Sequence, residues 1–233
     1  MVQAPYTPET LYPDSDGQPM SDNTEQYDWI VRIVSNLKYL LKDEIAFVAG
    51  DLLWYPVQVD APPAPRQAPD ALVAFGRPSG YRGSYKQWEE DNIAPQVVFE
   101  ILSPSNTHRE MAEKQNFYDT HGVLESYYYD PDSKDFWGFS RSQPGETFTL
   151  ITPLYLPWTS PLLNIRFELD QNGLVIFHPD GNAFELPGQV FAERDEAQAE
   201  RDEAQAERDA AREKLEQAHA KLRELGIDPD QLS

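Results

Sequence analysis

Two acidic residues, Asp70 and Glu100, have the type and the setting of metal-binding carboxylates. Asp70 opens the apolar segment DALVAF, and Glu100 lies inside the apolar run QVVFEIL at 96–102. A carboxylate is costly to remove from water unless a partner or a metal accompanies it. If these segments are neighbouring strands, the two carboxylates converge at one end of a sheet. Mg²⁺ binds through one or two carboxylates while it keeps several waters, and such a site generates a nucleophile and neutralises a phosphate oxygen.

Each acid also has an ordinary structural interpretation. Pro-Asp is common turn chemistry, and by itself Asp70 is better explained as a turn or cap residue. Glu100 could face solvent at a strand end or pair with an arginine. Strand alternation, however, places Glu100 on the same face as Val98 and Leu102. These apolar neighbours favour a functional role for Glu100.

Lys114 is the third candidate, on a predicted helix that follows the second acid. Met111, Gln115 and Tyr118 share its helix face at the spacing of three and four residues. Part of this face is apolar or aromatic and is expected to point inward. The lysine could extend to the edge of that face, or it could place an ammonium beside the two acids, where it orients water or stabilises negative charge.

The elements that must position these residues follow from hydrophobic periodicity and turn signals. Residues 24–42 predict an amphipathic helix, and residues 106–122 predict another, with a capping box at Thr107 and Glu110 and a terminal Gly122. The remaining segments predict extended structure, a hairpin and short strands: 46–59, 69–75, 96–102, 124–140, TFTLITP, LNIRFEL and GLVIFHP. This order predicts an α/β or α+β domain with a mixed sheet flanked by helices.

The polar loop at 76–92 is the local stretch with a composition suited to nucleic acid. Basic and aromatic residues alternate in it before the first acid, namely Arg77, Tyr81, Arg82, Tyr85, Lys86 and Trp88. Such side chains suit phosphate contact and base stacking. A solvated glycine-rich loop with an aromatic lid explains the same pattern slightly better. The net charge of −21 argues against tight, non-specific DNA binding.

The C-terminal stretch differs from the rest of the chain. AERDEAQ occurs twice from residue 192 and is followed by AERDAAR, a seven-residue repeat. The core positions hold Arg194, Arg201 and Arg208 with alanines, which is weak coiled-coil chemistry. A solvated helix that self-associates mainly through its last two heptads is at least as good an interpretation.

Composition limits the environment of the chain. The sequence has no cysteine, which excludes disulfides and thiolate metal sites. It shows no signal peptide and no apolar run long enough for a bilayer. We expect a soluble cytoplasmic protein, with an extended arm at 1–21, one α/β domain at 22–187 and a heptad-repeat helical tail at 188–228.

Taken together, PDALVAFG, PQVVFEILSPSN, the helix carrying EKQNFYDTHGV and LESYYYDPD resemble one known family. The sequence at 24–180 is similar to the Uma-type putative restriction endonucleases of the PD-(D/E)XK nuclease superfamily, in which a helical tail of this composition is familiar. The resemblance implies a helix–three-strand–helix–strand core and Mg²⁺-dependent cleavage of phosphodiester bonds.

Carried over by position, the resemblance matches Asp70 to the first acid and Glu100 to the second. The superfamily places a lysine two residues after the second acid, where this chain has Leu102. The resemblance therefore implies Lys114 as a migrated replacement. It also implies the Ile101 carbonyl as a further metal ligand.

Glu25 is the weak candidate for an acid that superfamily members often add from the first helix. The leading hypothesis is thus an endonuclease that uses Mg²⁺ or Mn²⁺, acts on DNA and forms a homodimer through its C-terminal helix. A catalytically inactive, nuclease-fold interaction protein is the first alternative. A metal-dependent hydrolase of a small phosphorylated substrate is the second.

Overall fold

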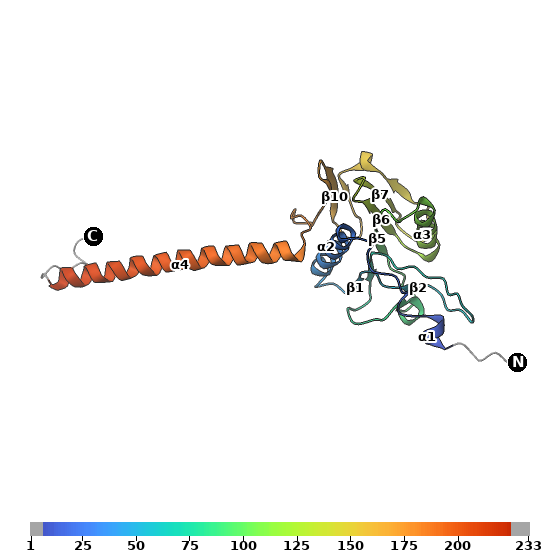
Figure 1. The fold of residues 1–233 in the computed structure, drawn as a ribbon, viewed down its shortest axis with the longest axis horizontal. Coiled ribbons are helices and arrows are strands. Elements are labelled where there is room, and N and C mark those ends of the chain that lie inside the picture. Colours follow the sequence, from blue (N-terminus) through green and yellow to red (C-terminus); the bar gives the residue numbers. More distant parts are fainter. Residues whose placement is uncertain (1–6, 225–233) are drawn as a thin grey trace. The chain divides into compact units, whose positions relative to one another are not determined.

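A six-stranded mixed sheet in the order β1-β3-β5-β6-β7-β8 organises the first of two units in the computed structural model, which describes residues 7–224 (Figure 1). Its strands are β1 Ala46–Ala49, β3 Ala71–Phe75, β5 Val97–Ile101, β6 Glu125–Asp130, β7 Asp135–Ser140 and β8 Thr149–Ile151. Strands β5 and β6 pair in parallel, and the other neighbours in this sheet pair antiparallel. The predicted α/β fold class with a mixed sheet is confirmed.

Two helices cover opposite faces of this sheet. Helix α2, Thr24–Leu40, begins at Asn23, whose side chain accepts a hydrogen bond from the Gln26 N–H, and it packs its apolar face into one core cluster. Helix α3, His108–His121, makes the parallel crossover from β5 to β6 and packs into the second cluster. The predicted capping box of α3 is present, and Gly122 ends the helix in the left-handed conformation at φ 98°.

Strand alternation divides the residues of β5 between these two layers. Val97, Phe99 and Ile101 lie in the cluster under α2, whereas Val98 lies in the cluster under α3. Glu100 has the parity of Val98 and therefore points toward α3. The helix that carries Lys114 is thus the layer that covers this acid.

Smaller elements complete the first unit. Strands β2 Trp54–Tyr55 and β4 Tyr85–Lys86 form a parallel pair. Strands β9 Trp158–Thr159, β10 Arg166–Asp170 and β11 Gly173–Phe177 form a separate antiparallel sheet. Short helices α1 Pro8–Leu11, η1 Gln87–Glu89 and η2 Pro153–Tyr155 lie in the connections.

The stretch before α2, predicted as an extended arm at 1–21, is attached to the β2–β4 pair where the structure describes it. Tyr12 is buried and its ring packs against Tyr55 and Trp88. The Tyr55 hydroxyl donates to the Pro13 carbonyl, and the Ser84 hydroxyl donates to Asp14. These contacts hold the arm at three consecutive residues. Residues 1–6 lie outside the described part of the chain.

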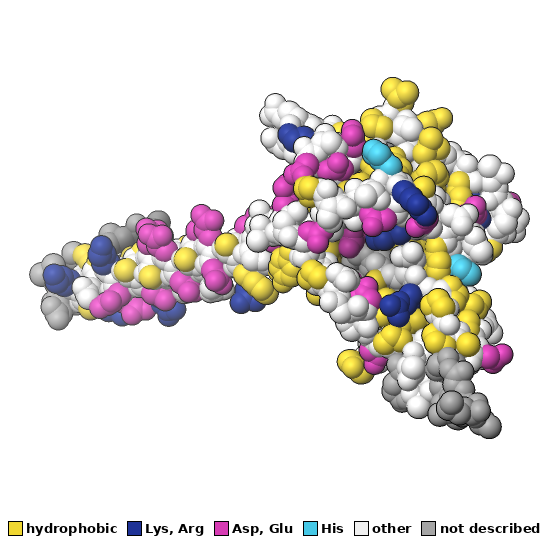
Figure 2. All heavy atoms as spheres, turned by 45° about the vertical axis from the view of Figure 1, so that its right-hand side comes forward, with side chains coloured by type: hydrophobic (Ala, Val, Ile, Leu, Met, Phe, Trp, Pro, Cys, Tyr) yellow, Lys and Arg dark blue, Asp and Glu magenta, His cyan; other side chains and the backbone are white. Residues whose placement is uncertain are grey.

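The second unit begins at Pro187 and consists, as far as it is described, of helix α4, Pro187–Glu224. Acidic side chains are spread along it (Figure 2). Its repeats place hydrogen-bonded pairs four residues apart, such as Gln198–Asp202 and Gln205–Asp209. Self-association of this helix stays a prediction, and the end of the predicted tail, 225–228, lies outside the described residues. No helix within residues 7–224 has the length and apolar character needed to span a membrane.

Candidate active site

The pairing of β3 with β5 brings Asp70 and Glu100 to the same end of the sheet. Asp70 directly precedes β3, and Ala71 pairs with Phe99 in the antiparallel ladder. The start of β3 therefore meets the end of β5. The Ile101 N–H donates to Asp70 Oδ2 over 2.6 Å, which ties the first acid to the backbone beside the second. Among the described residues, no hydrogen bond reaches the other oxygen of Asp70.

Two residues of α3 bind the Glu100 carboxylate. Its side chain is 2% exposed; Oε2 accepts a hydrogen bond from Lys114 Nζ at 2.6 Å, and Oε1 accepts one from the Tyr118 hydroxyl. Lys114 and Tyr118 are one helical turn apart, so both reach the same carboxylate. Tyr118 is fully buried. The sequence pattern placed it on the Lys114 face but gave it no role.

Asp51 is a third acid at this end of the sheet, and it was not among the predicted site residues. It follows β1 by two residues, and its N–H donates to the Pro69 carbonyl at 3.1 Å, directly beside Asp70. Gly50 makes this approach possible, because a Cβ there would lie 2.9 Å from Val34 Cγ2 and 3.2 Å from the Asp70 carbonyl oxygen. The available signal was a Gly-Asp pair immediately after an apolar strand.

A hollow of about 450 Å³ opens over this end of the sheet. Its lining includes six acids, namely Asp16, Asp22, Asp51, Asp70, Glu110 and Glu113. Lys114 is the only cation in the described lining. Glu100 does not line the hollow and lies beneath the lysine. The site therefore presents a large excess of negative charge around one ammonium group.

This charge distribution shifts the pKa values of the site residues. Burial, followed by the negative charge of Glu100, raises the pKa of Asp70 well above the ordinary value. Burial alone would lower the pKa of Lys114, but the charges of Glu100 and Asp70 outweigh it and raise the pKa. Asp51 keeps contact with solvent, yet desolvation and the charges of Asp16 and Glu100 raise its pKa to about 6 despite Lys114. Lys114 is thus a stable cation, whereas Asp70 and Asp51 resist carrying their full charge.

Helix α2 contributes Gln26 to the site. Gln26 is buried, and its Nε2 donates to the Ile101 carbonyl at 2.8 Å. A carbonyl oxygen has two lone pairs, so this contact leaves one available for a cation. Glu25, the acid predicted from this helix, is exposed and does not line the hollow.

The loop from β5 to α3 is fastened to the start of α2 at the rim of the hollow. Asp22 accepts hydrogen bonds from the hydroxyls of Ser103 and Ser105. These contacts lower the pKa of the Asp22 carboxyl. The SPSN turn therefore ties the start of α2 to the end of β5. This connection keeps Gln26 against the Ile101 carbonyl.

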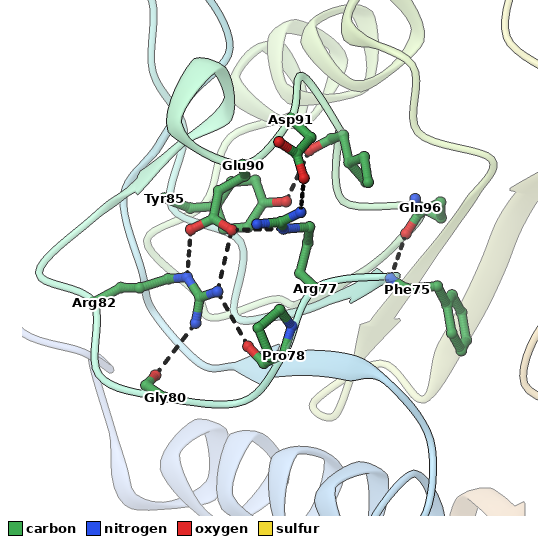
Figure 3. A network of polar contacts seen from close by, with 10 residues as sticks. Phe75, Arg77, Pro78, Gly80, Arg82, Tyr85, Glu90, Asp91 and Gln96 are labelled. Carbon is green, nitrogen blue, oxygen red and sulfur yellow. Dashed lines mark hydrogen bonds and ion pairs between the residues drawn. The ribbon is translucent and has the colours of Figure 1, made fainter.

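Most of the predicted nucleic-acid contacts lie elsewhere and are already engaged. Figure 3 shows Arg77 and Arg82 directed at Glu90, with distances of 2.8 Å and 2.5 Å from Nε to the carboxylate. Arg77 also pairs with Asp91. Tyr85 is buried, and its hydroxyl donates to a backbone carbonyl.

The other three predicted nucleic-acid contacts of this loop differ in their exposure. Trp88 packs on Tyr12, Lys86 is half-buried, and Tyr81 is 95% exposed. The two arginines and Tyr85 are thus parts of the folded loop, whereas contact with nucleic acid by Tyr81 and Lys86 stays a prediction.

The donor set at the hollow fits a hard divalent cation. The described residues contain no ready-made group of three or more acidic, histidine or cysteine ligands for a metal. Mg²⁺, however, is usually bound through one or two carboxylates, with waters and substrate phosphate oxygens completing its shell. The unengaged Asp70 oxygen, which faces an acid-rich hollow, has this chemistry.

One family model matches most of the chain. The family described as Uma2, putative restriction endonuclease, matches residues 12–170. No curated protein matches the chain. Among solved structures, a putative nuclease belonging to DUF820 from Anabaena variabilis is 18% identical, with a TM-score of 0.44, over 63% of this chain and 77% of that one.

Proposed function

Because the chain belongs to the Uma2 family of putative restriction endonucleases, we propose that it hydrolyses DNA phosphodiester bonds with the help of Mg²⁺ or Mn²⁺. Asp70 and Glu100 supply the carboxylates, the Ile101 carbonyl is a further ligand, and Lys114 stabilises the reacting phosphate. The observation that carries the proposal is the convergence of Asp70, Glu100 and Lys114 at one end of the sheet, where Asp70 and Lys114 line the hollow and Glu100 lies beneath the lysine.

The residues divide the work according to their surroundings. When bound, the divalent cation supplies an activated water and neutralises phosphate charge. Asp70, with one oxygen fixed by the Ile101 N–H, would hold that cation through its other oxygen. Lys114 stays protonated at neutral pH, so its role is electrostatic stabilisation of developing negative charge rather than proton abstraction. Glu100, itself held by the Tyr118 hydroxyl, fixes the position of the Lys114 ammonium group.

Lys114 can replace the lysine that this chain lacks two residues after Glu100. Leu102 stands there, but Lys114 Nζ reaches Glu100 from the next helix at 2.6 Å. An ammonium group is therefore available beside the acids, although it comes from a different element. This contact favours an active nuclease over the inactive interaction protein.

Two copies would cut the two strands of a duplex if α4 pairs them. A twofold dimer places two equivalent sites in opposite orientation. The 38-residue helix with heptad repeats supports such pairing. Sedimentation of the purified chain, with and without residues after Leu186, measures it.

The direct test is cleavage of DNA by the purified protein. Wild type and the Glu100→Gln variant are incubated with supercoiled and single-stranded DNA and Mg²⁺ or Mn²⁺. The matched control is Glu90→Gln, which makes the same change at a glutamate outside the site. We expect nicking by wild type and by the control, and its loss in Glu100→Gln. No nicking by wild type, or equal nicking by all three proteins, defeats the proposal and favours the interaction protein.

A further inference from the structure

Because Glu100 is engaged by other residues, few carboxylate oxygens in the hollow remain for a metal ion. Its two oxygens accept hydrogen bonds from Lys114 and Tyr118, and its side chain lies beneath the lysine rather than in the lining. Asp70 offers one unengaged oxygen. A divalent cation in the hollow would therefore find a second carboxylate only on another residue of the lining.

Four of the other lining acids already have partners. Asp16 accepts from the Gln18 N–H, and Asp22 accepts from Ser103 and Ser105. Glu110 is part of the capping box of α3, and Glu113 pairs with Arg109. Among the described residues, no hydrogen bond or ion pair engages the carboxylate of the remaining acid, Asp51.

The backbone conformation of Asp51 and one hydrogen bond fix its position. Its backbone is in the left-handed region at φ 46°, where residues other than glycine are uncommon and Asp and Asn are enriched. The hydrogen bond from its N–H to the Pro69 carbonyl fixes it next to Asp70. Its charge interacts with that of Lys114 and with that of Glu100. Asp51 therefore lies in the electrostatic reach of the whole site.

We infer that Asp51 is a metal-holding residue of this site, paired with the neighbouring Asp70 in the lining of the hollow. Strand β1 then contributes the additional acid that was expected from the first helix, because that helix supplies Gln26 there instead. On this inference Asp51 takes the place of Glu100 as the second carboxylate, and Glu100 serves mainly to anchor Lys114. The inference rests on the proposed function, since it assigns a ligand to the same cation.

The test measures binding of Mn²⁺ to the metal-free protein by calorimetry, without DNA and without turnover. The variant is Asp51→Asn, and asparagine tolerates the left-handed backbone as aspartate does. The matched control is Asp16→Asn, which removes one charge from the same lining and keeps an oxygen for its hydrogen bond. Asp51→Asn should weaken binding at least about tenfold, since even outer-shell partners of metal ligands cost about 10- to 100-fold. The control should change it less than about threefold.

The outcomes separate this inference from the proposed function. If Asp51→Asn and Asp16→Asn weaken binding equally, Asp51 acts only through its charge and the inference is wrong. If Asp70→Asn abolishes binding at the same time, the proposed function still holds. If wild type binds no Mn²⁺, both fail. Circular dichroism of each variant establishes that the fold is retained, and a folded Asp51→Asn protein with unchanged affinity overturns the inference.

Discussion

Two clusters of charged residues in the first unit each hold a buried glutamate, and they differ in charge balance. Around Glu90, two acids face two arginines, Arg77 and Arg82, and both arginines bond directly to the glutamate. Arg82 also lies 4.0 Å from the Phe47 ring centroid. The charges of this cluster cancel, and its contacts close the loop between β3 and β5 (Figure 3).

Around Glu100 the charges do not cancel. Asp51 and Asp70 join it, and Lys114 is the one cation among the described residues of the hollow. The pKa directions differ accordingly. Hydrogen bonds from Arg82 and Arg77 lower the pKa of Glu90 despite its burial, whereas burial and the Glu100 charge raise the pKa of Asp70. A balanced cluster stabilises a fold, and an unbalanced one retains affinity for a cation.

Removal of the Lys114 charge should cause the largest loss in the free energy of unfolding. Lys114→Met leaves the buried Glu100 without its ion pair, and breaking such a pair typically costs about 3 kcal/mol or more. We expect a loss of about 3 kcal/mol in the free energy of unfolding, measured with urea. The double variant with Glu100→Gln should recover part of it. A loss below about 1 kcal/mol in the single variant would show that water already compensates Glu100.

Glu90→Gln should weaken the balanced cluster by a smaller amount. Hydrogen bonds to charged groups contribute about 1.5–3 kcal/mol, and the amide can still accept from one arginine. We expect a loss of about 2 kcal/mol near pH 7. Because folding lowers the pKa of Glu90, this contribution is present above the ordinary glutamate pKa and disappears as the pH falls through the folded value. A loss that does not depend on pH would contradict this assignment.

Asp70→Asn should change stability in the opposite direction. Folding raises the pKa of Asp70, so the ionised carboxylate opposes folding once the pH exceeds its unfolded pKa. The amide keeps an oxygen for the Ile101 N–H. We expect a gain of roughly 0.5 to 2 kcal/mol at pH 7.5, which shrinks as the pH is lowered toward 4. A destabilised variant at pH 7.5 would indicate that Lys114 already neutralises Asp70.

The sequence could predict the parts of the site that arise from local patterns. Glu100 stood out because strand alternation gave it apolar neighbours, and Lys114 followed from the helix face it shares with Tyr118. The capping box and Gly122 likewise marked the ends of α3. Each of these signals lies within a few residues of the feature it predicts.

What the sequence did not reveal depends on contacts across the fold. Asp51 belongs to the site because its N–H meets the carbonyl of Pro69, a neighbour only through strand pairing. Arg77 and Arg82 looked available for phosphate because their partner, Glu90, lies beyond the aromatic part of the loop. Composition alone therefore could not distinguish a loop whose basic residues are free from a loop whose basic residues pair with its own acids.

The most direct test of the central claim, that the unbalanced cluster is a cation site, compares thermal unfolding with and without Mn²⁺. A ligand that binds only the folded state stabilises it by about 2.7 kcal/mol at about 100 times its Kd. We expect Mn²⁺ to raise the melting temperature of wild type, whereas Asp70→Asn should melt higher without metal and gain little from it. Equal increases in the two proteins, or none in wild type, would show that this cluster is not a cation site.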